Sequence, residues 1–159
     1  MTETALYPIL VWGILLAGPV SAAALLFVRA PYGRHARPGW GPTVSSRLGW
    51  IVMELPSVLV FVGVYLRGDF RGAMVPMLFL ALWQVHYVHR ACIYPFRMRA
   101  EGKRSPVLIV ALALVFTTLN SYLNARWISH LGSYSTAWLL DPRFIAGVLV
   151  FVAGLVVNL

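Results

Sequence analysis

One carboxylate lies inside a segment that is otherwise apolar. Glu54 is near the middle of GWIVMELPSVLVF, residues 49–61, and Pro56 follows it closely. Removing a carboxylate from water favours its neutral form or a strong hydrogen bond to it. We therefore expect Glu54 to be protonated or tightly hydrogen-bonded. If the segment is helical, Trp50 at i−4 and Ser57 at i+3 share its face.

A second polar group occurs in WQVHYVHRACIY, residues 83–94. Its spacing of i, i+4, i+7 and i+11 places Trp83, Tyr87, Arg90 and Tyr94 on one stripe of a helix. Tyr87 would lie about two turns inside that helix, at a depth where a phenol needs a hydrogen-bond partner. Glu54 can be this partner, and the pair is then either a functional acid site or a structural hydrogen bond.

Other polar residues have competing interpretations. His86 and His89 form an i, i+3 pair, but without further ligands this is a weak metal signal, and no metal site is predicted. Arg90 can also extend from a helix end to lipid headgroups. Polar residues between 117 and 124 either widen the same polar pocket or connect neighbouring helices; they are Thr117, Thr118, Asn120 and Asn124.

The elements that must position these groups are long and apolar. The chain of 159 residues is 60% hydrophobic and 11% charged, with a mean hydropathy of +0.77, whereas soluble domains have about 25% charged residues. Five stretches approach the span of about 20 residues that crosses a bilayer; they are 8–28, 48–66, 73–94, 106–128 and 144–159. We predict an all-α, multi-pass transmembrane bundle forming a single domain over residues 1–159, with kinks at Pro56 and Pro76.

The formal net charge of +8 comes from short loops between these stretches. Basic residues are concentrated in the first and third loops, which the positive-inside rule places in the cytoplasm, with the N-terminus on the other side. This distribution favours a membrane protein in contact with lipid over a nucleic-acid binder. We expect a monomer, and the single Cys92 excludes an intramolecular disulfide.

Five short motifs carry a family resemblance: PYGRH at 31–35, ELPS at 54–57, HYVHR at 86–90, YPFRMR with GK at 94–103, and DPRFIAGVLVFVAGLVVN at 141–158. In order and spacing they resemble the N-terminal portion of the steroid 5α-reductases, or 3-oxo-5α-steroid 4-dehydrogenases. The resemblance implies a seven-helix membrane reductase that uses NADPH to saturate the 4,5 double bond of 3-oxo-Δ4 steroids. It implies the endoplasmic reticulum in a eukaryote and the inner membrane in a bacterium.

The resemblance also implies roles for individual residues. Glu54 and Tyr87 match the pair that hydrogen-bonds the steroid 3-keto oxygen while hydride is delivered to C5. Trp50 and Phe116 match walls of the substrate pocket. The residues that match cofactor contacts are Tyr32, Arg90, Lys103 and Asn158.

The resemblance ends at the last residue, where relatives continue. We therefore expect the C-terminal, cofactor-binding part to be absent from this chain and the isolated 159 residues to be inactive. One alternative is a related reductase acting on a polyprenol or an enoyl thioester, because one fold hosts several substrates. Another is a non-catalytic membrane binding protein in which Glu54 and Tyr87 form a structural hydrogen bond.

Overall fold

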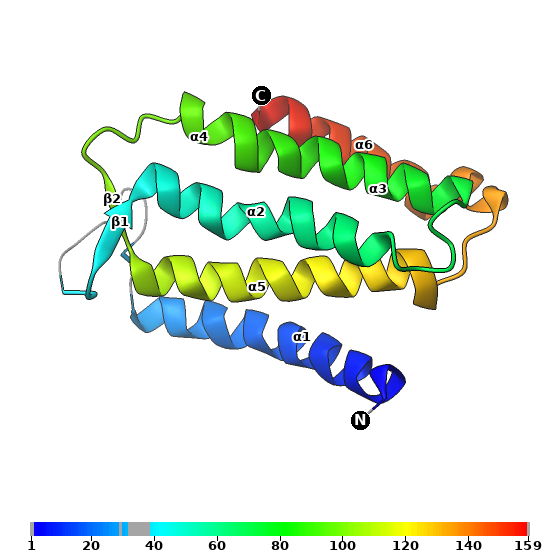
Figure 1. Ribbon diagram of the computed structural model, residues 1–159, viewed down its shortest axis with the longest axis horizontal. Coiled ribbons are helices and arrows are strands. Elements are labelled where there is room, and N and C mark those ends of the chain that lie inside the picture. The colour runs from blue at the N-terminus through cyan, green and yellow to red at the C-terminus, as the bar shows by residue number, and fades with distance from the viewer. Residues whose placement is uncertain (1, 29, 32–38, 159) are drawn as a thin grey trace.

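The protein is a bundle of five long helical runs. The computed structural model describes residues 2–28, 30–31 and 39–158. Its helices are α1 (Glu3–Phe27), α2 (Ser46–Tyr65), α3 (Met74–Val88), α4 (Tyr94–Arg97), α5 (Val107–Arg126) and α6 (Pro142–Asn158). The π-helical segment η2 (His89–Ile93) joins α3 to α4, η3 (Trp127–Leu131) extends α5, and the 3-10 helix η4 (Thr136–Leu140) precedes α6. The five predicted helices are confirmed (Figure 1).

Helix α2 lies between α3 and α5 and packs most extensively against α5 (Figure 1). The core at this junction consists of Phe61 and Tyr65 from α2 with Ala125 from α5, all almost fully buried. Trp83 of α3 stacks on Phe61, with ring centroids 4.3 Å apart. Large aromatic residues bury much area and so dominate the packing of such a junction. The three helices therefore form the rigid part of the bundle.

A small two-stranded sheet, which the sequence did not predict, connects the starts of α2 and α5. Strand β1 (Thr43–Ser45) pairs antiparallel with β2 (Arg104–Pro106), with Val44 opposite Ser105. The Ser45 hydroxyl caps α2 by accepting the Leu48 N–H at 3.2 Å. Because α2 and α5 both leave this sheet, it fixes where the two helices begin relative to each other.

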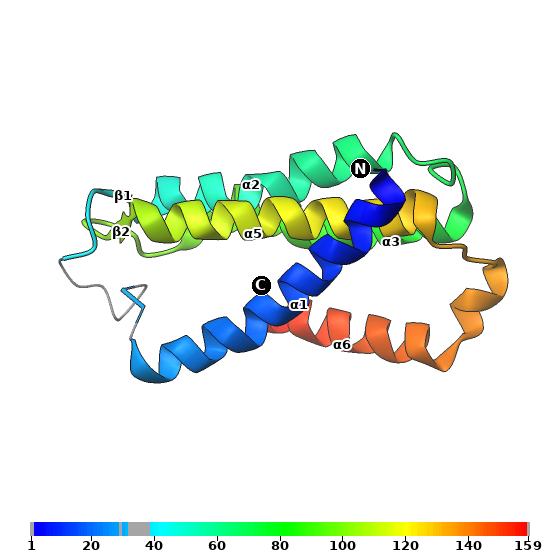
Figure 2. The same ribbon diagram turned by 90° about the horizontal axis from the view of Figure 1, so that it is seen from below.

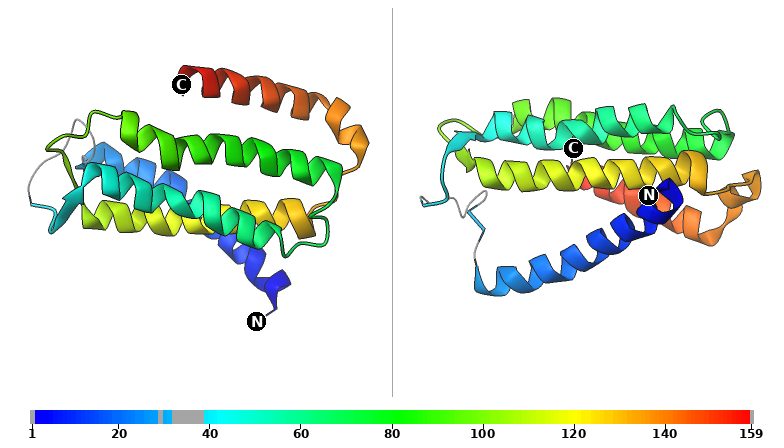
Figure 3. Two further views of the ribbon diagram at one scale, coloured as in Figure 1. Left: turned by 45° about the horizontal axis from the view of Figure 1, so that its top comes forward. Right: turned by 60° about the horizontal axis from the view of Figure 1, so that its bottom comes forward.

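Three helices are long and apolar enough to cross a membrane by length and composition: α1, α2, and α5 together with η3. Helix α6 is apolar but shorter. Helix α1 meets α5 near its own N-terminus, where Arg126 forms an ion pair with Glu3 at 2.6 Å, and then diverges from the bundle (Figure 2, Figure 3). It has no buried residue along its described length. Its apolar surface suits contact with lipid.

The start of α1 and the effect of Pro76 on α3 both differ from the prediction. Helix α1 begins at Glu3 rather than residue 8, because the Arg126 guanidinium and the Tyr122 hydroxyl both hold the Glu3 carboxylate against α5. Pro76 is the third residue of α3, a position where a missing N–H removes no intrahelical hydrogen bond. Pro76 therefore starts its helix instead of interrupting it, whereas Pro56 does lie inside α2.

The turn after α2 gives a test of packing. A Cβ atom on Gly68 would overlap both the hydroxyl oxygen and the carbonyl oxygen of Ser129. We expect Gly68→Ala to destabilise the fold by about 1–3 kcal/mol, as overpacking does. The measurement is the apparent melting temperature in detergent micelles. Gly72→Ala is the matched control because its Cβ meets nothing within 4 Å; equal melting temperatures for the two variants would contradict the packing described for Gly68.

Candidate active site

Glu54 is buried in α2 and bound by an arginine from the neighbouring helical run. Glu54 is 5% exposed, and its Oε1 accepts a hydrogen bond from Arg90 Nε at 2.7 Å. The prediction that Glu54 has a strong hydrogen bond is confirmed. The partner in the described structure is Arg90, not the Tyr87 hydroxyl, so Arg90 does not simply extend to headgroups.

Trp50 holds Arg90 in place from two sides. The indole N–H of Trp50 donates to the carbonyl oxygen of Arg90 at 3.0 Å, and the Arg90 guanidinium carbon lies 4.8 Å from the centroid of the Trp50 ring. Arg90 belongs to η2, and π-helical turns of this kind often occur at functional sites. The cation–π contact and the indole hydrogen bond together orient the guanidinium toward Glu54.

Tyr87 lies next to this ion pair on α3. Its hydroxyl faces Ser57 and experiences the charges of both Glu54 and Arg90. Trp83 contacts Tyr87 in a tilted ring pair with centroids 4.6 Å apart and donates its indole N–H to the Ser57 carbonyl oxygen at 2.7 Å. The Ser57 hydroxyl is buried and makes no geometrically satisfactory hydrogen bond to any described residue. The predicted neighbours Glu54, Ser57 and Tyr87 are thus brought together.

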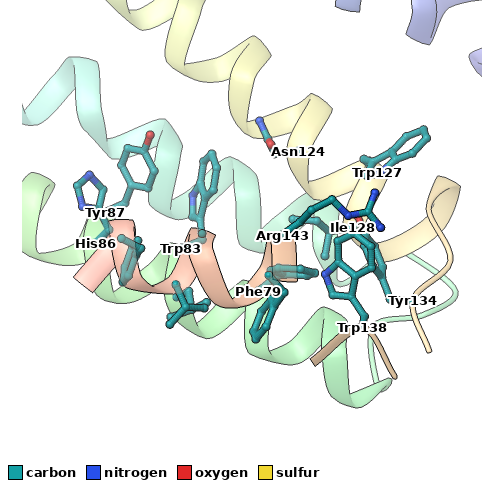
Figure 4. A pocket seen from close by; sticks show the side chains of 15 residues that line it. Phe79, Trp83, His86, Tyr87, Asn124, Trp127, Ile128, Tyr134, Trp138 and Arg143 are labelled. Carbon is teal, nitrogen blue, oxygen red and sulfur yellow. The ribbon is translucent and has the colours of Figure 1, made fainter. Parts of the chain in front are cut away.

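A cavity of about 530 Å³ opens beside Tyr87, between α3, η3, η4 and α6. Ligand pockets commonly have about 300–1,000 Å³. Figure 4 shows His86 and Tyr87 at one end of its lining, with Tyr134 and Trp138 at the other. The walls between these ends are mainly apolar and aromatic. The cavity therefore suits an elongated apolar molecule that has a polar group at the Tyr87 end.

The far end of the cavity is lined by Trp138 and by Arg143, which forms an ion pair. The Arg143 guanidinium carbon lies 4.7 Å from the Trp138 ring centroid, and Arg143 Nη2 is 2.7 Å from Asp141 Oδ2. The hydrogen bond from Arg143 lowers the pKa of the Asp141 carboxyl to about 2. This pair therefore stays ionised at ordinary pH and keeps Arg143 over the ring.

The other predicted site residues lie apart from the cavity or outside the described structure. Phe116 on α5 is 53% exposed and does not line the cavity. Lys103 is exposed just before β2, and its carbonyl oxygen accepts the Ser46 N–H at 3.0 Å. Tyr32 lies outside the described residues, and so does the side chain of Asn158, the last residue of α6. The roles of these four residues remain predictions.

The polar residues of α5 were predicted either to connect neighbouring helices or to widen the pocket, and both roles occur. Thr117 connects helices by donating to the Met53 carbonyl oxygen at 2.6 Å, while Thr118 bonds within its own helix to Leu114. Asn124 lines the cavity. For the histidines, no cluster of three or more metal-ligating side chains occurs among the described residues.

Comparison with known proteins shows what this chain is similar to. Residues 103–159 match the family model described as 3-oxo-5-alpha-steroid 4-dehydrogenase. In an alignment 154 positions long that covers 92% of this chain, the sequence is 40% identical to a steroid 5-alpha-reductase of Arabidopsis thaliana. In one 131 positions long that covers 80% of the chain, it is 40% identical to 3-oxo-5-alpha-steroid 4-dehydrogenase 1 of Homo sapiens.

Fold and site define a helical membrane protein with a buried carboxylate beside an aromatic cavity. The comparisons narrow this class: the chain belongs to the steroid 5α-reductase family. The matched regions cover 58% of the Arabidopsis relative and 50% of the human one. The chain thus spans about half the length of these relatives.

The Glu54–Arg90 ion pair can be tested by removing its cation. In Arg90→Leu the carboxylate would stay buried without its donor, and an unsatisfied buried acceptor costs about 1–3 kcal/mol. We expect the lower part of this range because the Arg90 side chain is 39% exposed and water can reach the vacated space. The measurement is denaturant unfolding in micelles. Arg67→Leu is the control, because Arg67 reaches only a carbonyl of its own helix; an Arg90→Leu variant as stable as this control would contradict the pairing.

Proposed function

We propose that this protein is, or forms part of, a membrane reductase that saturates the 4,5 double bond of 3-oxo-Δ4 steroids. The observation that supports this most is the buried Glu54, with Arg90 bound to it and Tyr87 beside it, next to an aromatic cavity. An elongated, apolar ring system with a ketone at one end matches the shape and polarity of that cavity.

The chemistry requires help at the ketone oxygen. When hydride adds to C5 of the enone, negative charge moves through the conjugated system to the 3-keto oxygen. Donors fixed in a dry site stabilise this charge without reorganising. The Tyr87 hydroxyl and a protonated Glu54 would provide two such donors. Ketosteroid isomerase offers a precedent, because an apolar site there keeps a carboxylic acid neutral so that it can donate a hydrogen bond.

NADPH, implied by the family resemblance, would supply the hydride. The described residues fit a dinucleotide at the end of the bundle where α4 and the β1–β2 sheet lie (Figure 1). Three exposed basic side chains there make neither an ion pair nor a hydrogen bond with a described residue, unlike Arg47 and Arg104, which bind the Pro95 carbonyl oxygen and Thr43; the three are Arg97, Arg99 and Lys103. Flexible, exposed cations suit phosphate groups. Of these three, only Lys103 is among the cofactor contacts predicted from the resemblance, and the other predicted contacts are Tyr32, Arg90 and Asn158.

The same basic end gives the proposed orientation. The positive-inside rule puts the loops that bear Arg97, Arg99 and Lys103 in the cytoplasm, where a dinucleotide is available. The N-terminus of α1 and the turn after α2, which contains Asp69, would then lie on the opposite side. The protein would reside in the endoplasmic reticulum of a eukaryote or the inner membrane of a bacterium.

Turnover by site variants tests the proposed roles. In the protein expressed from its complete gene, we expect Glu54→Leu and Tyr87→Phe each to lower kcat for a Δ4-3-keto steroid by about 100-fold or more, since each removes a donor and one lost oxyanion donor costs about 10²–10³. The assay is NADPH-dependent formation of the 5α product. Tyr122→Phe is the control for Tyr87, because its hydroxyl binds Glu3 outside the cavity. Unchanged kcat in both site variants would refute the roles.

Cofactor affinity tests the basic end. Replacing both Arg99 and Lys103 by Ala should weaken NADPH binding about 10-fold or more, because each exposed cation removed loses one phosphate interaction. The measurement is the dissociation constant from fluorescence titration, repeated at high salt, where the difference should shrink. Replacing Arg67 and Arg71 at the opposite end is the matched control. A larger loss in the control variant would contradict the proposed site.

A further inference from the structure

Arg90 uses only one edge of its guanidinium for Glu54. Its Nε donates to the carboxylate at 2.7 Å, whereas its two Nη groups make no hydrogen bond to any described residue. The Arg90 side chain is 39% exposed and that of Glu54 is 7% exposed. The forked Nη edge is therefore open to a second anion, and a guanidinium can bind phosphate through two parallel N–H groups.

The proposed function creates a conflict at Glu54. To donate a hydrogen bond to a ketone, the carboxyl group must hold a proton. An Arg90 that binds nothing else favours the ionised carboxylate, which accepts its hydrogen bond. The pairing with Arg90 therefore favours the charge state of Glu54 that cannot serve as a donor. Glu54 must therefore gain a proton before it can donate a hydrogen bond to the ketone.

We infer that an anion bound to the free Nη edge of Arg90 causes Glu54 to take up a proton. Arg90 is then a positioning residue that couples occupation of the cofactor-phosphate site to the acid form of Glu54. This inference rests on the proposed function and specifies how its two halves are connected: Glu54 becomes a donor only when the anionic cofactor is present.

The charge balance around Arg90 supports this coupling. With Glu54 alone, one partly exposed cation faces one buried anion. A phosphate on the opposite edge would place two anions on either side of a single guanidinium, and the two anions would repel each other. Protonating the carboxyl removes this repulsion. The Trp50 ring and its hydrogen bond to the Arg90 carbonyl restrain Arg90 from moving away instead.

Other ionisable groups near the pair must be considered as proton acceptors. Tyr87 from α3 faces Glu54 but is neutral and has no proton to gain. His86 on α3 feels the charge of Arg90, with His89 beside it. On the α5 side, the neighbouring polar contact is the neutral Thr117 hydroxyl, which is bonded to Met53. From α2 itself, Arg47 is directed to the Pro95 carbonyl oxygen of α4. The histidines are therefore the competitors to exclude.

Calorimetry can count the protons. NADP⁺ and, separately, inorganic pyrophosphate would be titrated at neutral pH into the protein expressed from its complete gene, in buffers of different ionisation enthalpy. We expect uptake of up to about one proton per bound ligand. Glu54→Gln should bind NADP⁺ with this uptake abolished, while the control His86→Gln should retain it. Wild-type binding without uptake, or uptake that survives in Glu54→Gln, would overturn the inference.

A second variant tests Arg90 itself. Arg90→Lys keeps the positive charge but offers no second edge, so it should bind NADP⁺ with clearly reduced proton uptake; full uptake would contradict the coupling.

These measurements do not depend on turnover. If proton uptake occurs but no Δ4-3-keto steroid is reduced, the proposed function fails and the coupling stands. If steroid is reduced without proton uptake, the coupling fails and the proposed function stands.

Discussion

The structure around the site depends on the need of one buried carboxylate for a cation. Glu54 lies in a helix that is apolar enough to span a membrane, where an unpaired charge is costly. Arg90 meets this need from the neighbouring run. Trp50 orients Arg90, and the Ser45 cap with the β1–β2 sheet sets the start of the helix that bears both Trp50 and Glu54. Each of these local features helps to bring Glu54 and Arg90 into contact.

Trp83 links the ion pair to the cavity. It binds the Ser57 backbone through its indole N–H, stacks on Phe61 in the core and packs at a tilt against Tyr87 at the cavity wall. The position of Tyr87 is therefore set by the most rigid part of the bundle. Fixing a donor on packed helices, and not on a loop, is what a preorganised site requires. The opposite end of the cavity is lined by the less regular η4 and by the start of α6.

Much of this arrangement was predictable from the sequence, and the exceptions have physical reasons. Runs of about 20 apolar residues indicated the helices, and the cost of a buried charge predicted a strong bond to Glu54. The partner was missed because the periodicity of α3 assumes a uniform α-helix, whereas η2 changes the turn that carries Arg90. The β1–β2 sheet joins residues such as Val44 and Ser105 that are distant in sequence, so no local pattern indicates it. Trp138 reaches the cavity only through the tertiary fold; the aromatic content of its loop was the only available signal.

The most direct test of the proposed site is the vibrational frequency of the substrate carbonyl. The protein expressed from its complete gene would be loaded with NADP⁺ and a Δ4-3-keto steroid labelled with ¹³C at C3, and its isotope-edited infrared spectrum recorded. If Glu54 and Tyr87 donate to the 3-keto oxygen, the carbonyl stretch must lie below its value in an apolar solvent and return toward that value in Glu54→Leu and Tyr87→Phe. A stretch that equals the apolar-solvent value in the wild-type protein would contradict the proposed site.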